Sequence, residues 1–324
     1  MQEEIRTCLR GAVFDLTTVM YRPDSLDNKI IKELGSPRFF QWNVRESYAS
    51  IAKRLGIDEE TVRKRIKRAV KTGSIQGWRV VIHPHLIGHE DVEVDLEVND
   101  AERKPEIVSQ IKLIEGVIWI LDFEGTGLFV LFYSESGQAL SRKVQLIRTI
   151  CGAEKLTMWS NSLPPCDIKI SRTDWRIIWA IRDDPRKSLS EIAKEAGVTT
   201  RTVNRRLTLL TESRAFFLVG LANFRQSAGV SCNMLIFCPH ENSKYSAAER
   251  IVSRFENIVF GGSTSSNYLF YNMVFDNLYE ANEAYEWIKG LKGVGAVRMG
   301  IMRDLIFVRD WLDEEMKKGM SKDP

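Results

Sequence analysis

Two segments of this 324-residue chain carry cationic and amide side chains at the spacing of one helix face. Arginine and asparagine in the first half of a helix can pair with the edges of guanine and adenine, and flanking cations can neutralise phosphates. Both segments therefore carry groups suited to reading a nucleic-acid duplex. The first set is Glu59, Glu60, Arg63, Lys64 and Lys67, flanked by Arg65 and Arg68; the second is Thr200, Arg201, Asn204, Arg205 and Thr208, flanked by Arg206.

Both segments belong to a unit that occurs twice in the chain. Two windows share eight identical residues at a constant separation of 141 positions, and the same separation recurs downstream. An upstream motif, Asp-x-x-Ile-Ile, repeats at 147 positions, and the difference fits a longer loop in the first copy. We predict a duplicated two-domain unit, joined near Pro164 and Pro165. The aligned features are Ser47–Ile66 with Ser188–Leu207, Gly88 with Gly229, Gly152 with Gly293, and Asp27 with Asp174.

Each unit is predicted to begin with three helices. In the second copy, Ser188 is suited to begin the middle helix, with Glu191 completing a capping box, and Gly197 is suited to the left-handed turn that ends it. A helix, a glycine turn and a second helix form the helix-turn-helix arrangement. The predicted core positions of the third helix are Val62, Ile66 and Val70 in the first copy and Val203, Leu207 and Leu210 in the second. In the first copy Gly56 is suited to the turn and Asp58 to the cap of the third helix.

The segments after the third helices are predicted to form wings. In the first copy, a turn at residues 71–74 leads into Ile75–Ile82, which is predicted to form short strands. A hairpin that only covers the helices is the alternative. The second segment, Phe216–Asn223, is apolar with few cations, and we predict that it packs against protein.

The formal charge of +3 hides an uneven distribution. Residues 43–82 contain ten basic and four acidic side chains, whereas residues 89–135 contain three basic and twelve acidic ones. The first module can approach a polyanion and the second cannot. Ordinary solvated charge on exposed helices is the competing interpretation of the cationic faces.

Composition excludes several other classes of protein. No apolar run approaches the roughly 18 residues of a membrane span, and the N-terminus lacks a secretory pattern, so we expect a cytoplasmic protein without membrane contact. Five cysteines without a C-x-x-C pair argue against a disulfide framework. The cluster of His83, His85 and His89 reads as a loop beside Pro84, and we predict neither a metal nor a cofactor.

The second part of each unit shows the order strand, helix, strand, strand, helix, strand. Such a βαββαβ order with right-handed crossovers gives a four-stranded antiparallel sheet backed by two helices. The expected elements are residues 92–98, 106–114, 117–122, 128–133, 138–150 and 155–159 in the first copy, and 232–238, 247–255, 258–261, 268–275, 281–291 and 296–302 in the second.

These motifs resemble the Lrp/AsnC family of prokaryotic regulators. The resemblance rests on the Asp-x-x-Ile-Ile opening, on Ser-x-x-x-Ile-Ala-Lys (Ser47–Lys53 and Ser188–Lys194), and on the Gly-x-x-x-x-Thr-Val-x-x-Arg segment that follows. Residues 82–88 are similar to the family's connector after the wing. The match covers about residues 25–160 and 172–303, and it implies ferredoxin-like domains whose sheets pair face to face between subunits.

We therefore predict an α+β fold in which two winged helix-turn-helix domains alternate with two ferredoxin-like βαββαβ domains. The expected boundaries are an N-terminal extension (1–24), winged helix-turn-helix 1 (25–85), ferredoxin-like domain 1 (86–163), winged helix-turn-helix 2 (170–226), ferredoxin-like domain 2 (227–303) and a C-terminal helix (304–324) that packs on the second domain.

The resemblance also implies a small effector, often an amino acid, bound at the loop between the second and third strands. In the family this loop usually presents glycine followed closely by aspartate, which would pair with an α-amine. This chain has no acid at that place, so tight turns between paired strands are the alternative. The candidate effector residues are Gly125, Thr126 and Gly127 in the first copy and Ser263, Thr264, Ser266 and Asn267 in the second.

Together these features predict a sequence-specific transcription regulator that binds double-stranded DNA through two unlike recognition helices. A chain with two units is expected to fold as its own pseudo-dimer, and association of further copies stays open. One alternative is an enzyme like the sirohaem decarboxylases, in which tandem units of this kind have lost the DNA role. Against it, no histidine lies between His89 and His240, and no catalytic residue is predicted. The other alternative is a protein-interaction module.

Overall fold

A computed structural model describes residues 24–34, 45–161, 163, 166, 168–224, 229–263 and 267–321. The predicted N-terminal extension apart from Asp24, most of the long loop after the first helix, and the junction at Pro164 and Pro165 lie outside the described residues.

Each unit begins with the three helices that the sequence predicts. They are α2 (Ser25–Leu34), α3 (Tyr48–Leu55) and α4 (Glu59–Lys71) in the first unit, and α7 (Arg172–Ile181), α8 (Leu189–Ala196) and α9 (Thr200–Glu212) in the second. The predicted caps are confirmed: Asp58 accepts from the Thr61 amide at 2.8 Å, and Ser188 forms a capping box with Glu191. Gly56 and Gly197 adopt φ values of 67° and 66°, which suit glycine at the turn.

The core side of α4 differs from the prediction at one position. Val62 and Ile66 are buried as expected, but Val70 is 44% exposed and Ala69 is buried instead. Because a helix turns once every 3.6 residues, the positions three and four after Ile66 both lie near its side, and in this fold the third one faces the core.

The strand after each helix-turn-helix pairs with the corresponding strand of the other unit. β1 (Ile75–Ile82) and β6 (Phe216–Ala222) form a two-stranded antiparallel sheet, so neither segment folds back as a hairpin on its own helices. At its centre Trp78 pairs with Gly220 and Arg79 pairs with Val219. Trp78 and Val219 are equivalent positions of the repeat, as are Arg79 and Gly220, so exchanging the two units converts one pair into the other. A local two-fold axis requires this register. The predicted packing of the second segment against protein is confirmed.

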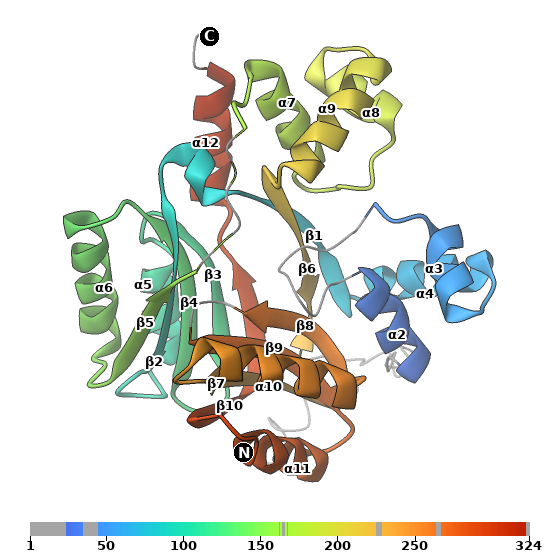
Figure 1. Ribbon diagram of the computed structural model, residues 1–324. Coiled ribbons are helices and arrows are strands. Elements are labelled where there is room, and N and C mark those ends of the chain that lie inside the picture. Colours follow the sequence, from blue (N-terminus) through green and yellow to red (C-terminus); the bar gives the residue numbers. More distant parts are fainter. Residues whose placement is uncertain are drawn as a thin grey trace, which may run out of the picture.

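The remaining strands form two ferredoxin-like sheets that are joined edge to edge (Figure 1). Each sheet has the expected strand order, β5-β2-β4-β3 in the first unit and β10-β7-β9-β8 in the second, and β10 also pairs with β3. The elements are β2 (Glu90–Glu97), α5 (Lys104–Ile111), β3 (Val117–Phe123), β4 (Gly127–Ser134), α6 (Gln138–Cys151) and β5 (Leu156–Ser160), then β7 (Val230–Phe237), α10 (Glu241–Arg254), β8 (Ile258–Ser263), β9 (Tyr268–Phe275), α11 (Leu278–Lys289) and β10 (Ala296–Phe307).

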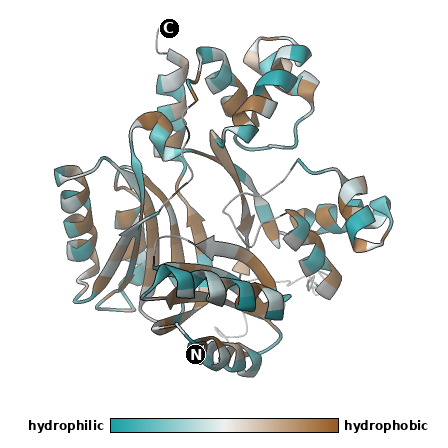
Figure 2. Ribbon diagram, in the orientation of Figure 1, coloured by the Kyte–Doolittle hydropathy of each residue, from teal (hydrophilic) through white to brown (hydrophobic). Residues whose placement is uncertain are grey.

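Hydrophobic residues predominate in the strands of these sheets (Figure 2). One face of each sheet packs under its own two helices, in separate clusters. The other faces meet each other and the helix-turn-helix domains in one large core. In that core Phe129 lies 5.4 Å from Phe270, and Trp159 stacks on Tyr268 at 4.5 Å between ring centroids. The face-to-face contact expected between subunits is thus made within one chain.

Three of the acids counted in the predicted acidic module are buried on that inner face. Asp91, Glu93 and Asp95 on β2 are all less than 10% exposed, because alternate residues of a strand point to the same side. Burial raises the pKa of both Asp91 and Glu93, and the neighbouring Asp91 charge adds to the effect on Glu93. The acidic character of this domain's surface is therefore weaker than the sequence suggested.

The C-terminal segment differs from the predicted helix in extent and in position. β10 continues to Phe307, so the helix α12 (Asp310–Ser321) starts later than residue 304. α12 packs on α7 of the second helix-turn-helix, and not on the second ferredoxin-like domain. Arg309 pairs with Asp183 at 3.2 Å, and Trp311 donates to Glu115 in the first ferredoxin-like domain at 3.3 Å.

The histidine cluster lies at a short 3-10 helix, η1 (Pro84–Ile87), which contains His85 and is capped by His83. His83 is buried, and its Nδ1 accepts from the His85 amide at 3.2 Å. Among the described residues, no group of three histidine, cysteine, aspartate or glutamate side chains is placed to hold a metal ion. Within the same residues, no helix has the length and apolar character that crossing a bilayer requires.

The packing of α12 on α7 depends on a glycine. A Cβ atom at Gly319 would lie 2.4 Å from ring atoms of Trp175, so we expect Gly319→Ala to lower the free energy of unfolding by about 1–3 kcal/mol through overpacking. This direction opposes the intrinsic helix propensity, which favours alanine by about 1 kcal/mol. Urea unfolding measures the change. The exposed Glu314→Ala in the same helix should stay within about 0.5 kcal/mol, and a stabilised Gly319→Ala protein would contradict the packing.

Candidate nucleic-acid interface

The outer face of α9 presents exposed polar side chains without ionic partners. Arg201, Asn204 and Arg205 are all exposed, together with Thr200 and Thr208. In the part of the chain that the structure describes, neither Arg201 nor Arg205 forms an ion pair. Val203, Leu207 and Leu210 on the opposite side are buried. The fold therefore holds two uncompensated guanidinium groups and an amide outward, at the positions where a recognition helix contacts bases.

The outer face of α4 has the same shape but a different charge balance. Arg63 forms an ion pair with Glu59 and lies 3.4 Å from Glu60, and Lys64 lies 3.9 Å from Glu60. The two acids stand in the first turn, where the helix dipole favours them. The predicted residues Glu60, Arg63 and Lys64 are thus brought together, with Lys67 exposed one turn later. The N-terminal half of this face has no net charge.

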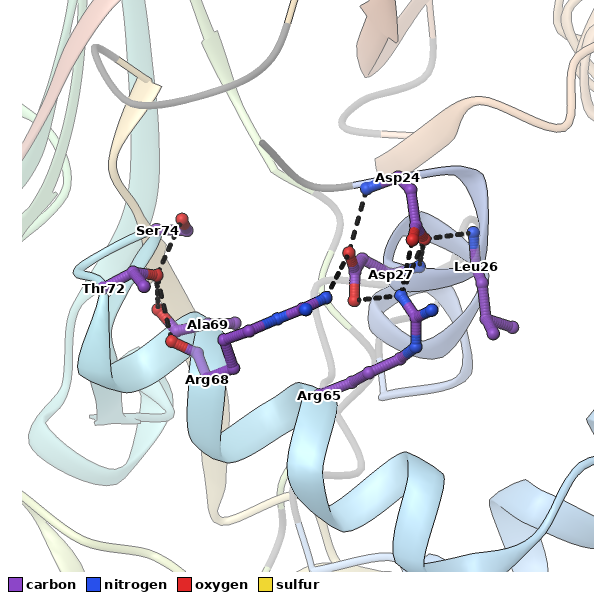
Figure 3. A network of polar contacts seen from close by, with 8 residues as sticks. All are labelled: Asp24, Leu26, Asp27, Arg65, Arg68, Ala69, Thr72 and Ser74. Carbon is purple, nitrogen blue, oxygen red and sulfur yellow. Dashed lines mark hydrogen bonds and ion pairs between the residues drawn. The ribbon is translucent and has the colours of Figure 1, made fainter. Parts of the chain in front are cut away.

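The arginines predicted to contact phosphates are bound to aspartates within each domain. In the first unit, Arg65 Nη1 lies 2.7 Å from Asp24 and 2.9 Å from Asp27, and Arg68 reaches Asp27 at 3.5 Å (Figure 3). Asp27 is 3% exposed, so these contacts fasten the third helix to the first.

The second unit repeats this contact. Arg206 grips Asp174 with two nitrogens, and its Nε lies 2.5 Å from Asp174 Oδ1. Asp174 is fully buried and also accepts from the Ser171 hydroxyl at 2.6 Å. Asp27 and Asp174 open the repeated motif, and Arg65 and Arg206 correspond at 141 positions. The guanidinium groups of both arginines are bound to carboxylates in this structure, and a phosphate contact by either stays a prediction.

The two helix-turn-helix domains also contact each other directly. Arg45, just before α3, donates to the carbonyl of Lys187 at 3.2 Å, and Arg186 donates to the carbonyl of Glu46 at 3.1 Å. The Arg186 guanidinium lies 4.3 Å from the ring centroid of Tyr48, and Arg63 of the reading face lies 5.5 Å from the same ring. Tyr48 therefore links the second domain to the recognition helix of the first.

Sequence reasoning missed this contact, although a signal for it existed. Arg45 and Arg186 are separated by 141 positions, so the repeat makes them equivalent residues. When two equivalent residues lie near a two-fold axis, each contacts the segment that carries the other. Arg45 contacts Lys187 in this way, and Arg186 contacts Glu46.

The candidate effector loop of the first unit is a tight turn with internal partners. The buried Lys104 pairs with Asp122 at 2.6 Å and donates to the carbonyl of Gly125 at 2.9 Å, and the carbonyl of Thr126 accepts from Val98 at 2.9 Å. Gly127 starts β4 and lies against Arg298 and Phe123. In the second unit, Ser263 ends β8 and the carbonyl of Asn267 accepts from Cys238 at 2.8 Å, whereas Thr264 and Ser266 lie outside the described residues. An effector site at these loops stays a prediction.

A small cavity lies where β6 crosses the inner faces of the two sheets. Its volume is about 70 Å³, and aromatic and aliphatic side chains of β3, β6, β8, β9 and β10 form most of its wall. The described lining residues with polar side-chain atoms are Asn233 and Asn272, which carry amides, and Trp119, which carries an indole nitrogen. None of its described lining side chains is charged.

Comparison with known proteins places these features in a family. A profile described as winged helix-turn-helix DNA-binding matches residues 170–213, which span α7 to α9. The transcriptional regulator LrpA of Pyrococcus horikoshii is 32% identical over 112 residues, which are 30% of this chain and 76% of LrpA. The chain belongs to the Lrp/AsnC family. The regulatory protein AsnC of Haemophilus influenzae is 24% identical over 152 residues, 44% of this chain and 96% of AsnC.

These shares confirm the tandem form of this Lrp/AsnC protein. LrpA and AsnC are matched over most of their own length by less than half of this chain, so one such regulator corresponds to one unit. A solved structure resembles both units together: the siroheme decarboxylase NirDL aligns over 91% of this chain and 98% of its own, with a TM-score of 0.54 and 15% identity. At that identity the likeness concerns the fold alone.

The buried contact between Arg206 and Asp174 yields a prediction with a defined pH dependence. Burial raises the pKa of Asp174, but hydrogen bonds from Arg206 and Ser171 outweigh it and hold the pKa below 3.8. We expect Asp174→Asn to lower the free energy of unfolding by about 1.5–3 kcal/mol at neutral pH, the range for hydrogen bonds to charged groups. The loss should shrink as the pH falls below 3.8, because protonation then removes the same charge from the wild type.

Urea unfolding at several pH values tests this expectation. The matched control is Glu195→Gln, which removes the charge of an exposed pair with Lys187 in the same domain and should cost less than about 1 kcal/mol. A loss at Asp174 that is equal to the control, or that does not depend on pH, would contradict a structural role for the pair.

Proposed function

We propose that this chain is a sequence-specific transcription regulator that binds double-stranded DNA through α4 and α9. The observation that carries the proposal is the outer face of α9, where Arg201, Asn204 and Arg205 are exposed and neither arginine has an ionic partner among the described residues. An arginine of this kind can donate two hydrogen bonds to guanine, and an asparagine can pair with adenine. Membership of the Lrp/AsnC family supports the same assignment.

The two helices are proposed to contribute unequally. On α4, Arg63 and Lys64 must exchange their pairs with Glu59 and Glu60 for contacts to DNA, whereas Arg201 and Arg205 on α9 have no such pairs to lose. Exposed pairs are worth less than about 1 kcal/mol each, so this exchange weakens binding by α4 without preventing it. The proposed DNA site is therefore asymmetric, with the stronger half-site under α9.

One chain is proposed to act as its own pseudo-dimer. The β1–β6 pairing and the contacts around Tyr48 hold both reading helices in a single molecule, so binding to two half-sites does not require a second copy. The separation of the half-sites is then fixed by contacts within the chain.

The second candidate function is that of a decarboxylase acting on a tetrapyrrole, which the likeness to NirDL over both units favours. A tetrapyrrole that carries several carboxylates needs cations in a large site, and ligand pockets usually measure roughly 300–1,000 Å³. The cavity between β6 and the sheets measures about 70 Å³, and none of its described lining side chains is cationic. Two larger hollows, of about 550 and 520 Å³, have cationic lining residues, but each lies along the paired helices of a single unit and is wide open to solvent. We therefore favour DNA binding.

Selection of bound sites from random duplexes, followed by affinity measurements, tests the proposal. We expect Arg205→Ala to weaken binding to the selected site by about 1–3 kcal/mol and to relax the choice of base at one position. Arg63→Ala should have a smaller effect, because the loss of a base contact is offset by release from Glu59 and Glu60. The control is Arg148→Ala, an equal charge change on the exposed face of α6, which should leave the affinity unchanged.

The wild-type affinity should also fall steeply with salt, with a log–log slope near −0.9 for each phosphate contact. Equal effects of Arg205→Ala and Arg148→Ala would show that α9 does not read bases. Absence of DNA binding at low salt, together with a change in the absorption of added sirohaem, would support the decarboxylase instead.

The contact between the two domains predicts a dependence on half-site spacing. In Arg186→Ala, the guanidinium group that reaches Glu46 and Tyr48 is lost, so the two domains should move more freely. We expect this variant to tolerate a wider range of spacings in selected sites, while its affinity for an isolated α9 half-site stays within about twofold. Arg176→Ala on α7 is a control in the same domain, and an unchanged spacing preference in Arg186→Ala would contradict the proposed role of the contact.

A further inference from the structure

The outer helices α6 and α11 occupy equivalent positions of the repeat but carry opposite charge. α6 has three basic side chains and no acidic one, whereas α11 has three acidic side chains and one basic one. At the repeat separation, Arg142 of α6 corresponds to Glu283 of α11. Both helices keep a fully buried isoleucine at another equivalent position, Ile147 and Ile288. The two helices therefore pack on their sheets in the same way and differ in charge on their exposed sides.

The groove between α5 and α6 combines exposed aliphatic side chains with a cation. It measures about 520 Å³ and is wide open to solvent. Leu113 and Leu146, both on its wall, are 86% and 48% exposed. Arg142 on the same wall is exposed and forms no ion pair within the described residues. Large exposed aliphatic side chains that gather in one groove are typical of an interaction surface.

The other charged side chains of this wall have partners within the protein. Lys143 donates to the carbonyl of Tyr133 at 2.9 Å, and Glu115 accepts a hydrogen bond from Trp311 at 3.3 Å. Among the described lining residues, Arg142 is thus the charge that is most available to a partner.

The equivalent groove between α10 and α11 is acidic. It measures about 550 Å³, and Glu280, Glu283 and Glu286 of α11 line it. Its lining arginine, Arg254, lies 4.7 Å from the ring centroid of Trp287 and is held against that ring. This groove is therefore suited to a partner that carries a cation.

One of these acids has the same availability as Arg142. Glu286 lies 3.6 Å from Lys289. Glu283 accepts a hydrogen bond from the Tyr279 hydroxyl but forms no ion pair in the part of the chain that the structure describes. The available charges of the two grooves are thus opposite in sign and stand at equivalent positions of the repeat.

The two grooves face away from each other within one chain. Each helix pair covers the outer face of its own sheet, and the inner faces meet in the common core, so α6 and α11 lie on different sides of the molecule (Figure 1). A contact between the same groove of two copies would bring two arginines or two glutamates together, and like charges repel. The surface that complements each groove is therefore the other groove of a second copy.

We propose that the α5–α6 groove of one copy docks on the α10–α11 groove of a second copy of this chain. Arg142 of one copy then faces Glu283 of the other, and Leu113 and Leu146 are buried between them. Exposed ion pairs contribute little by themselves, so the leucines supply the affinity and the charges select the partner groove. Such a head-to-tail contact leaves one free groove at each end, so association continues into a ring or a chain of copies. The contact goes beyond the proposed function and does not depend on DNA binding.

Sedimentation velocity of the full-length chain, at increasing concentration and without DNA, measures this association. We expect larger species to form as the concentration rises, and to dissociate as salt is added, because salt screens exposed charges. Arg142→Glu and Glu283→Arg should each weaken the association at least about tenfold, because each places like charges opposite one another. Leu113→Ser keeps the charges and should weaken it about tenfold through the lost apolar burial.

The matched control is Arg148→Glu. It makes the same change of charge on α6 at an exposed position outside the groove lining, and the dissociation constant should stay within about twofold of the wild type.

Two combinations of the charge variants separate loss of the interface from misfolding. An equal mixture of Arg142→Glu and Glu283→Arg chains has opposite charges at every contact when the two alternate, so it should associate like the wild type although neither variant does so alone. The double variant should recover in the same way.

Three results would overturn the inference. The first is a wild-type chain that stays monomeric at low salt up to its solubility limit, and the second is an equal effect of Arg142→Glu and Arg148→Glu. The third is an absence of recovery in both the mixture and the double variant, which would show that these two side chains do not face each other. Each of these results can be obtained whether or not the chain binds DNA.

Discussion

The antiparallel pairing of β1 with β6 is the contact on which the placement of both third helices, α4 and α9, depends. Each strand leaves the third helix of one unit and leads into the ferredoxin-like domain of the same unit. By pairing with each other around a local two-fold axis, the strands fix one helix-turn-helix relative to the other. The strands satisfy each other's backbone groups, which a lone strand in the core could not do. A hairpin within each unit would have left the two domains independent.

The two copies agree in their interior and differ on their reading faces. Both keep an aspartate in the first helix that binds an arginine in the third, and both keep a polar cap and a left-handed glycine at the turn. These contacts set the angle between the helices. The outer faces carry an acid–base mixture in one copy and uncompensated cations with an amide in the other. The same scaffold therefore presents two different chemical surfaces at one fixed separation.

The sequence was sufficient for features that depend on local periodicity. The helices, their caps and the two βαββαβ orders follow from residue spacing and turn residues, and the structure confirms them. The roles of Arg65 and Arg206 could not be read in this way, because their partners lie 38 and 32 residues away in another helix. On an isolated helix a structural arginine looks the same as a phosphate-binding one.

The acids of β2 illustrate a second limit. Alternating Asp91, Glu93 and Asp95 with valine predicts a strand with one polar, solvent-facing side. In this chain that side of β2 faces the other sheet. Trp159 of the neighbouring strand β5 donates to Glu93 at 2.5 Å, and Arg298 of β10 pairs with Asp95. The partners come from a different strand and from the other unit. Alternation identifies the two faces of a strand, but not what covers each face.

The covalent connection between the units explains where their symmetry ends. At the repeat separation, the extension of β10 over residues 302–307 corresponds to residues 161–166, which contain Pro164 and Pro165. Proline cannot donate a ladder hydrogen bond, so this sequence is unsuited to extend β5, and β5 ends at Ser160. Only the second copy can therefore extend its last strand along the edge of the other sheet. That strand is β10, and its extension pairs with β3. The strand of the second unit that corresponds to β3 is β8, and α2 of the first unit packs against it instead.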